Sequence, residues 1–296
     1  MKMKFIILLM AFLGFFHVCP AQQYLVEVEA LDHSYDIDAG QEIPSGWITF
    51  ALNNSMSEEI HEISLVRLPE GITHDDYLGP YMLAWSTLLK EFQEGKVVRE
   101  GINDRVNEML PDWSGKLKYV SSRGLISPGR TAWRTVNLEP GNYSMVCWMK
   151  AEDGEIHIMK GMSRALKVSE EKAAVSEPKP KAKLVLSGKQ IKTEWIAERG
   201  KHEFKFDVSK KEKSIPANIH LIKLEGDTDL DEVHNWMDWY KINGLRTPVG
   251  VEFLGGLEYS GSVDGYFSVD IKEPGEYAWI VCDHKGSGLY KRFSVK

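Results

Sequence analysis

Three cysteines among 296 residues are too few for a disulfide scaffold, and the usual motifs of catalytic sites are missing. The sequence has no glycine-rich phosphate loop, no GxSxG and no HExxH. It also has no Lys/Arg-rich run, and its net charge of −7 argues against a nucleic-acid-binding surface. Hydrophobic residues at 43% and charged residues at 27% are values of a globular protein, which excludes wholesale disorder and a protein of many membrane spans.

The first 21 residues are predicted to be a secretory signal peptide. Lys2 and Lys4 precede an apolar run over 5–16, which is too short to span a bilayer. Cys19-Pro20-Ala21 then offers small residues for cleavage before Gln22. A lipoprotein in which Cys19 carries the lipid is the alternative, but the residues before it are a poor match to that signal. We expect an exported protein, periplasmic or extracellular, with no transmembrane segment.

A duplication organises the rest of the chain. A stretch rich in Pro and Lys and without aromatic residues separates two similar halves, and it reads as an exposed linker. When Phe50 is laid on Phe206, the halves match at several points and both reach a Glu-Pro-Gly turn, at 139–141 and 273–275. The predicted parts are the signal peptide 1–21, a first domain 22–169, the linker 170–183 and a second domain 184–296.

Each half is predicted to be an antiparallel β-sandwich. Apolar and polar residues alternate with period two over 25–30, 133–138 and 267–271, which is typical of half-buried strands. Short strands between Gly, Pro and Asn turns favour a sandwich or a barrel. Each half also has one helical insertion, within 83–110 in the first half and starting at Asp229 in the second. The fold class is therefore all-β.

Residue types that bind metals gather around Cys147. This cysteine ends a predicted strand and faces the core, because side chains alternate along a strand. The loop that follows returns His157 and Met162, and His61 precedes another strand whose end can meet the same pole of a sandwich. Two imidazoles, a thiolate and a thioether suit copper, since sulfur favours Cu(I) and imidazole also accepts Cu(II).

The order of these residues resembles the cupredoxins, or blue copper proteins, and more narrowly exported bacterial cupredoxin-like domains. The matching motifs within residues 46–168 are His61-Glu62, Leu68-Pro69-Glu70-Gly71, Leu138-Glu139-Pro140-Gly141-Asn142-Tyr143, Cys147, Asp153-Gly154, His157 and Gly161-Met162. The resemblance implies tandem Greek-key cupredoxin-like domains, with copper in the first. It implies His61, Cys147 and His157 as equatorial ligands and Met162 as the axial one. Electron transfer to a redox partner protein, or copper handling, is the function it implies.

The second half is not expected to hold a metal. Ala217 stands where the alignment places His61, and Cys282 is shifted by one residue from the position that matches Cys147. A shift of one residue turns a strand side chain to the opposite face. Two cysteines in an oxidising compartment usually form a disulfide, but cysteines on different faces favour a free Cys147.

Two other classes of function compete with this interpretation. Nine tryptophans and 11 tyrosines suit a metal-free β-sandwich module that recognises a protein or a glycan at the cell envelope. An enzyme related to copper oxidases would need a second, His-rich copper cluster, and the chain has no His-x-His pair. We therefore predict that the protein is not an enzyme. The sequence gives no indication of its oligomeric state.

Overall fold

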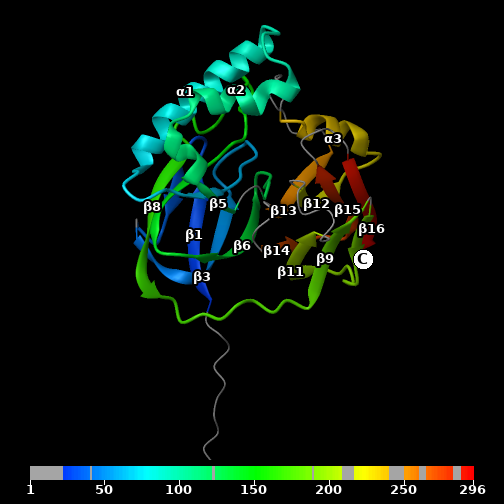
Figure 1. Cartoon of the computed structure of the whole chain (residues 1–296). Coiled ribbons are helices and arrows are strands. Elements are labelled where there is room, and N and C mark those ends of the chain that lie inside the picture. The colour runs from blue at the N-terminus through cyan, green and yellow to red at the C-terminus, as the bar shows by residue number, and fades with distance from the viewer. Residues whose placement is uncertain are drawn as a thin grey trace, which may run out of the picture.

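The structure is a computed structural model, which describes residues 23–40, 42–121, 124–188, 190–208, 217–239, 250–259, 265–282 and 288–296. The predicted signal peptide, with Cys19, lies outside these ranges. Within them the chain is mostly β, as predicted, with helices gathered at one end of layered sheets (Figure 1).

The first half is a sandwich of two β layers. Its strands are β1 (Tyr24–Ala30), β2 (Tyr35–Ile37), β3 (Glu42–Asn54), β4 (Ser64–Arg67), β5 (Lys118–Ser121), β6 (Arg130–Leu138), β7 (Gly141–Val146) and β8 (Ser163–Lys172). One layer has the order β2-β1-β3-β6, and the other has the order β8-β7-β4-β5. The first residues of β3 also pair with β8, so this long strand connects the two layers.

The second half has the same two-layer arrangement. Its strands are β9 (Ala182–Ser187), β10 (Gln190–Thr193), β11 (Gly200–Val208), β12 (Ala217–Leu224), β13 (Val251–Tyr259), β14 (Gly265–Ile271), β15 (Gly275–Cys282) and β16 (Gly288–Val295). One layer has the order β10-β9-β11-β14 and the other β13-β12-β15-β16. Phe204, Phe206 and Trp279 fill the core between them, each without exposed surface.

Residues that the sequence alignment places together occupy corresponding positions in the two halves. Val26 of β1 lies opposite Phe50 of β3 in a parallel pair, and Leu184 of β9 lies opposite Phe206 of β11 in another parallel pair. The antiparallel pairs that also match are Arg67 with Tyr143 and Lys223 with Tyr277. The two halves therefore share strand order and register.

The two halves are joined edge to edge as well as by the chain. Strand β14 pairs with β6, with Phe267 opposite Arg134, so one layer of each half continues into the other (Figure 1). Strand β15 is buried on both faces. Its Tyr277 and Trp279 pack in the core of the second half, whereas Ile280 packs in the apolar cluster of the first half. The apolar sequence of β15 follows from this double burial.

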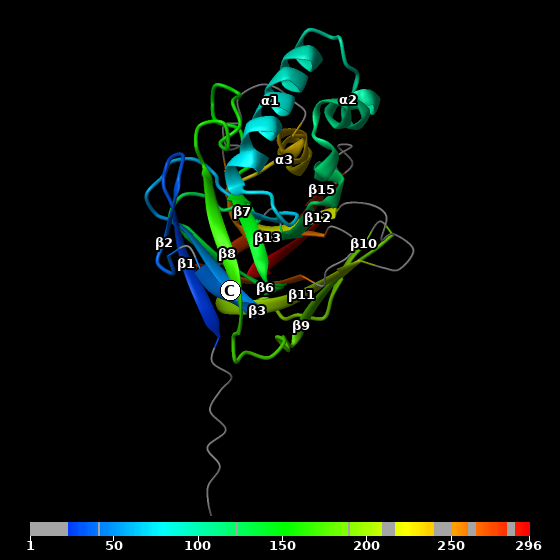
Figure 2. The same cartoon turned by 60° about the vertical axis from the view of Figure 1, so that its left-hand side comes forward.

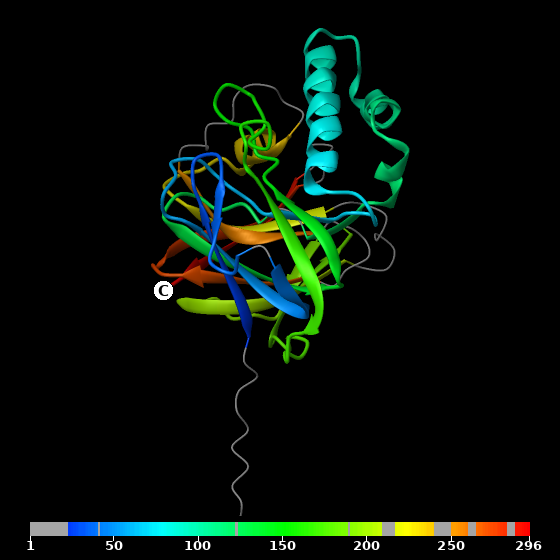
Figure 3. The ribbon, with the colours of Figure 1, turned by 90° about the vertical axis from the view of Figure 1, so that its left-hand side faces the viewer.

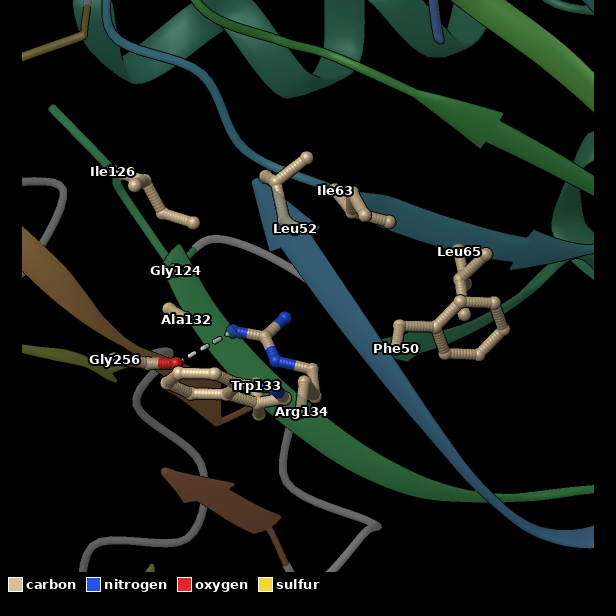
Figure 4. Close-up of a pocket in the computed structure, with 10 residues that line it drawn as sticks. All are labelled: Phe50, Leu52, Ile63, Leu65, Gly124, Ile126, Ala132, Trp133, Arg134 and Gly256. Carbon is tan, nitrogen blue, oxygen red and sulfur yellow. Dashed lines mark hydrogen bonds between the residues drawn. The ribbon is translucent and has the colours of Figure 1, made fainter. Parts of the chain in front are cut away.

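Backbones of the two halves approach closely at a pair of glycines. Figure 4 shows this junction, where the Arg134 guanidinium donates to Gly256 O at 2.8 Å beside an apolar cavity of about 30 Å³. A Cβ on Gly124 would lie 2.8 Å from Gly256 O, and a Cβ on Gly256 would lie 2.0 Å from Ile219 O. A side chain on Gly124 would push the halves apart, whereas one on Gly256 would clash with β12 of its own half, so only glycine fits at either position.

Helical insertions are present in both halves, as predicted. They are α1 (His74–Gln93), the 3₁₀ turn η1 (Arg99–Gly101), α2 (Ile102–Met109), the 3₁₀ turn η2 (Asp112–Lys116) and α3 (Leu230–Met237). Helix α1 begins earlier than predicted because Thr73 and Asp76 form a capping box. Helix α3 begins after Asp229, whose carboxylate accepts from Asp231 N at 2.9 Å. All three helices lie at one end of the molecule (Figure 2).

At this helical end, polar groups of the first half contact the segment that follows α3. Arg99 forms two hydrogen bonds with the Asp238 carboxylate, at 2.8 and 2.6 Å. The Lys150 ammonium donates to Trp239 O at 2.6 Å and lies 4.4 Å from the ring centroid of that residue. The Trp239 indole donates in turn to Trp148 O at 2.7 Å. Burial lowers the pKa of Lys150 to about 8.

The predicted linker begins and ends inside strands. Strand β8 runs to Lys172 and β9 starts at Ala182, so residues 173–181 are the part without strand structure. Its residues are exposed or half-buried. Across the described ranges, no helix combines the length and the apolar character that a membrane crossing requires.

We predict that proteolysis cuts the chain first within residues 173–181, because this segment lies outside the strands and has no buried residue. The two fragments should stay together after cutting, since β6–β14 pairing and the shared apolar cluster connect them. Gel filtration of the nicked protein under native conditions measures this. Separation into two fragments of half the mass would contradict the joined arrangement, and a first cut inside a half would contradict the proposed division.

We predict that Lys150 makes the free energy of unfolding rise with pH in the alkaline range. Its pKa in the folded protein, about 8, lies below that of the unfolded chain, so the unfolded chain binds more protons above pH 8. The free energy of unfolding of the wild type, relative to Lys150→Met, should therefore rise between about pH 8 and 10.5, by at most about 3 kcal/mol. Urea unfolding of both proteins across this range measures the difference. Parallel pH profiles would show that Lys150 is not the cause.

Candidate metal centre

The residues after β7 fold back as a short hairpin, and this brings His157 to Cys147. An isolated bridge and a turn at Gly154, whose φ is +86°, close the hairpin. His157 N donates to Met149 O at 2.7 Å, and Ile158 N donates to Cys147 O at 3.1 Å. Nine residues separate Cys147 from His157 in sequence, but these backbone hydrogen bonds bring the two residues together in space.

Met162 holds both ends of this loop through its backbone. Cys147 N donates to Met162 O at 3.2 Å, and Met162 N donates to His157 O at 2.9 Å. The Met162 side chain has no exposed surface and belongs to the same apolar cluster as Cys147. The Met162 thioether is therefore buried in the same apolar cluster as the Cys147 thiol.

His61 reaches the same place from the segment before β4. Its backbone forms two hydrogen bonds with Ile126, at 3.2 and 3.0 Å. Its ring Nε2 lies 2.8 Å from Ser57 Oγ, and its Nδ1 is buried without a hydrogen-bond partner. When Nε2 carries the ring hydrogen and donates it to the serine, the lone pair of Nδ1 is free to bind a metal.

Glu62 connects the segment of His61 to that of Cys147. Its buried carboxylate accepts from Trp148 N at 3.0 Å and from Ser64 Oγ at 3.2 Å. Its backbone oxygen accepts the hydroxyl of Tyr35. Glu62 follows His61 and Trp148 follows Cys147, so the hydrogen bond between Glu62 and Trp148 fixes the separation of the His61 and Cys147 side chains.

Three of the four predicted ligands converge. His61, Cys147 and His157 each offer one donor atom, and these atoms lie within 4.8 Å of one another. Cys147 Sγ is 3.5 Å from His157 Nδ1, and the two imidazole centroids are 5.0 Å apart. All three residues have no exposed surface. Ligand bonds of about 2.0 and 2.3 Å at a tetrahedral angle separate N and S by about 3.5 Å, so this pair fits a metal.

Burial sets the protonation of these groups. It lowers the pKa of His61 to about 4 and that of His157 to about 3, so both rings are neutral at pH 7 and can donate a lone pair. Burial and the nearby Glu62 raise the pKa of the Cys147 thiol, which therefore keeps its proton until a cation replaces it.

His157 also has an outer face, and the sequence analysis missed the residues that lie there. His157 Nε2 is 2.9 Å from Glu59 Oε2, and His33 Nε2 is 3.5 Å from the same oxygen. Glu59 lies two residues before His61, a spacing that could have identified it. His33 lies in the turn between β1 and β2, far from every quoted motif, and only the fold brings it here.

Among the described residues, two groups of side chains could hold a metal ion, and both belong to the first half. They are His61 with Cys147 and His157, and His33 with Glu59 and His157. The side chain of Cys282 lies outside the described part of the chain, and its backbone pairs with Asn218 at the end of β15. Cys147 is a free thiol.

No protein-family model matches the chain, and no curated protein matches it. Several solved structures are similar. Reduced auracyanin of Roseiflexus castenholzii has 19% identity and a TM-score of 0.29, covering 50% of this chain and 98% of its own. Auracyanin A of Chloroflexus aurantiacus, a blue copper protein, has 15% identity and a TM-score of 0.28, covering 50% and 100%. A multicopper oxidase has 10% identity and a TM-score of 0.25, covering 93% and 89%.

We predict that Cys147 resists thiol reagents in the folded protein, because it has no exposed surface and stays protonated. In a Cys282→Ser variant, labelling by a disulfide reagent should be at least about 100-fold slower without urea than with it. The release of the chromophore over time measures both rates. Equal rates would show that the thiol is accessible.

Proposed function

We propose that the protein is an exported, tandem cupredoxin-like protein that binds one copper ion in its first half, at His61, Cys147 and His157, for electron transfer or copper handling. The observation that carries the proposal is the convergence of a thiol and two neutral imidazoles in a fully buried position. Matching strand order and register in the two halves support tandem copies. Lys2, Lys4 and the apolar run 5–16 support export.

The donor set fits copper, and a site of given N and S donors binds Cu²⁺ more tightly than Zn²⁺. One thiolate and two imidazoles suit both Cu(I) and Cu(II), whereas Ca²⁺ and Mg²⁺ prefer oxygen ligands. His61 Nδ1 is a buried nitrogen atom without a partner, so hydrogen bonds alone do not satisfy this ring. Copper bound here would supply a one-electron redox centre. We propose the buried Met162 as the axial ligand, which tunes such a centre more than it holds it.

The surrounding chain holds the donors in place before any ion arrives. Backbone hydrogen bonds fix Cys147 between Met162 and Ile158, and Glu62 fixes the position of Trp148. Rigid donors favour electron transfer, because the site need not rearrange when the oxidation state changes. A redox partner protein would receive or supply the electron.

The second half is proposed to have a structural role. Strand β14 covers the edge of β6, and Ile280 of β15 completes the apolar cluster that contains Cys147. We propose no enzymatic activity, since an oxidase of the copper type needs a second cluster rich in histidine and the sequence has no His-x-His pair.

We predict that Cu(II) gives the protein an intense thiolate-to-copper absorption band in the visible. Cys147→Ser should abolish this band, because a serine hydroxyl is a hard donor that cannot replace a thiolate. Cys282→Ser, the matched control, should retain it. Met162→Leu should keep a coloured site with a shifted reduction potential. Visible spectra and potentiometric titration of the four proteins measure these outcomes.

A colourless wild type after copper addition would contradict the proposal. The function would then be that of a metal-free binding module. A band that survives Cys147→Ser and disappears in Cys282→Ser would place the copper at a different thiol.

A further inference from the structure

We propose that His33, Glu59 and His157 form a second site for a divalent cation, on the outer side of His157. The inner group, His61, Cys147 and His157, lies on one side of the His157 ring, and His33 with Glu59 lies on the other. The ring thus offers Nδ1 to the thiol and Nε2 to the carboxylate.

The separations of the outer donor atoms fit one ion. His157 Nε2 is 2.9 Å from Glu59 Oε2, His33 Nε2 is 3.5 Å from that oxygen, and all three donors lie within 4.8 Å of one another. A tetrahedral ion with bonds of about 2.1 Å separates its ligand atoms by about 3.4 Å. The two separations from Glu59 Oε2 are within about half an ångström of this value, and the third is at most 4.8 Å.

None of the three donor atoms has a hydrogen bond in the structure. His33 Nε2, Glu59 Oε2 and His157 Nε2 are all buried atoms without a hydrogen-bond partner. Glu59 Oε2 and His157 Nε2 are 2.9 Å apart, so a proton on the nitrogen or a cation between the two atoms can join them. The His157 side chain is only 1% exposed, so bulk water does not solvate this nitrogen. A buried polar atom left unpaired is costly, and a cation would satisfy all three atoms at once.

The outer group lies nearer to solvent than the inner group, although its three donor atoms are themselves buried. The side chains of His33 and Glu59 are 33% and 34% exposed, whereas the inner donors have no exposed surface. Lys160, the nearby positive charge, is bound to the Asp153 carboxylate at 2.5 Å. Asp32, next to His33, is exposed and adds negative charge on this side. An incoming cation thus meets the outer donors first.

Two imidazoles and one carboxylate define the class of ion. This set suits Zn²⁺ and Cu²⁺, and lacks the several oxygen ligands that Ca²⁺ and Mg²⁺ require. Because His157 belongs to both groups, the outer site is positioned to receive copper on its way to Cys147. A neutral imidazole has one lone pair, so copper that moves from Nε2 to Nδ1 does so as the ring proton moves from Nδ1 to Nε2, and the Cys147 thiol proton is released to solvent. This loading role rests on the proposed function, while binding at the outer site does not.

The binding test uses a full-length chain without the inner site. In His61→Gln/Cys147→Ala, Cu²⁺ should bind with one-to-one stoichiometry, without a thiolate band and with nitrogen coupling in its electron paramagnetic resonance spectrum. Adding Glu59→Gln or His33→Gln should weaken binding at least about tenfold, since each removes one of three ligands. Glu58→Gln, at the exposed neighbouring carboxylate, should leave the affinity unchanged. Equal affinity with Glu58→Gln and Glu59→Gln would overturn the outer site.

Loading is measured with the inner site intact, which also covers the case in which the double variant does not fold. Glu59→Gln should slow the appearance of the thiolate-to-copper band severalfold at limiting Cu²⁺, whereas Glu58→Gln should leave its rate unchanged. Unchanged kinetics would overturn the loading role. A colourless wild type together with Cu²⁺ binding that depends on Glu59 would overturn the proposed function and keep the outer site.

Discussion

The short hairpin after β7 is the constraint on which the candidate centre depends. His157 N donates to Met149 O, Ile158 N donates to Cys147 O, and Cys147 N donates to Met162 O, so three of the four predicted ligands are joined through main-chain hydrogen bonds. The fourth, His61, is held by Ile126. Donor geometry therefore depends on backbone pairing, which tolerates side-chain changes in the loop better than packing alone would.

The second half contributes one face of β15 to the apolar cluster that contains the candidate ligands Cys147 and Met162. The face of β15 that carries Ile280 packs in the cluster that includes Cys147 and Met162, while the other face carries Trp279 into the core of its own sandwich. Cys147 itself has no exposed surface. Burial of His61 and His157 lowers the pKa of both imidazoles and keeps them neutral at pH 7.

Patterns that are local in sequence predicted most of the fold and the core-facing position of Cys147. Alternation over 133–138 identified β6, and the strand period placed Cys147 toward the core. The start of α1 was missed because its capping box at Thr73 precedes the apolar stripe. The β6–β14 pairing and the approach of His33 to Glu59 connect residues far apart in the chain, and no periodicity encodes which edges or turns meet.

The joined edges of β6 and β14 have a consequence for self-association. An unpaired strand at the edge of a sheet is a template for another chain, and proteins usually protect such edges with charge, proline or a bulge. Here each half covers the edge of the other, and the strands of both halves lie together below the long helix in Figure 3. Either half made alone would expose a strand edge that is paired in the whole protein. The exposed strand would be β6, with Thr135, or β14, with Phe267. Aggregation into intermolecular sheets is the expected fate of the isolated halves.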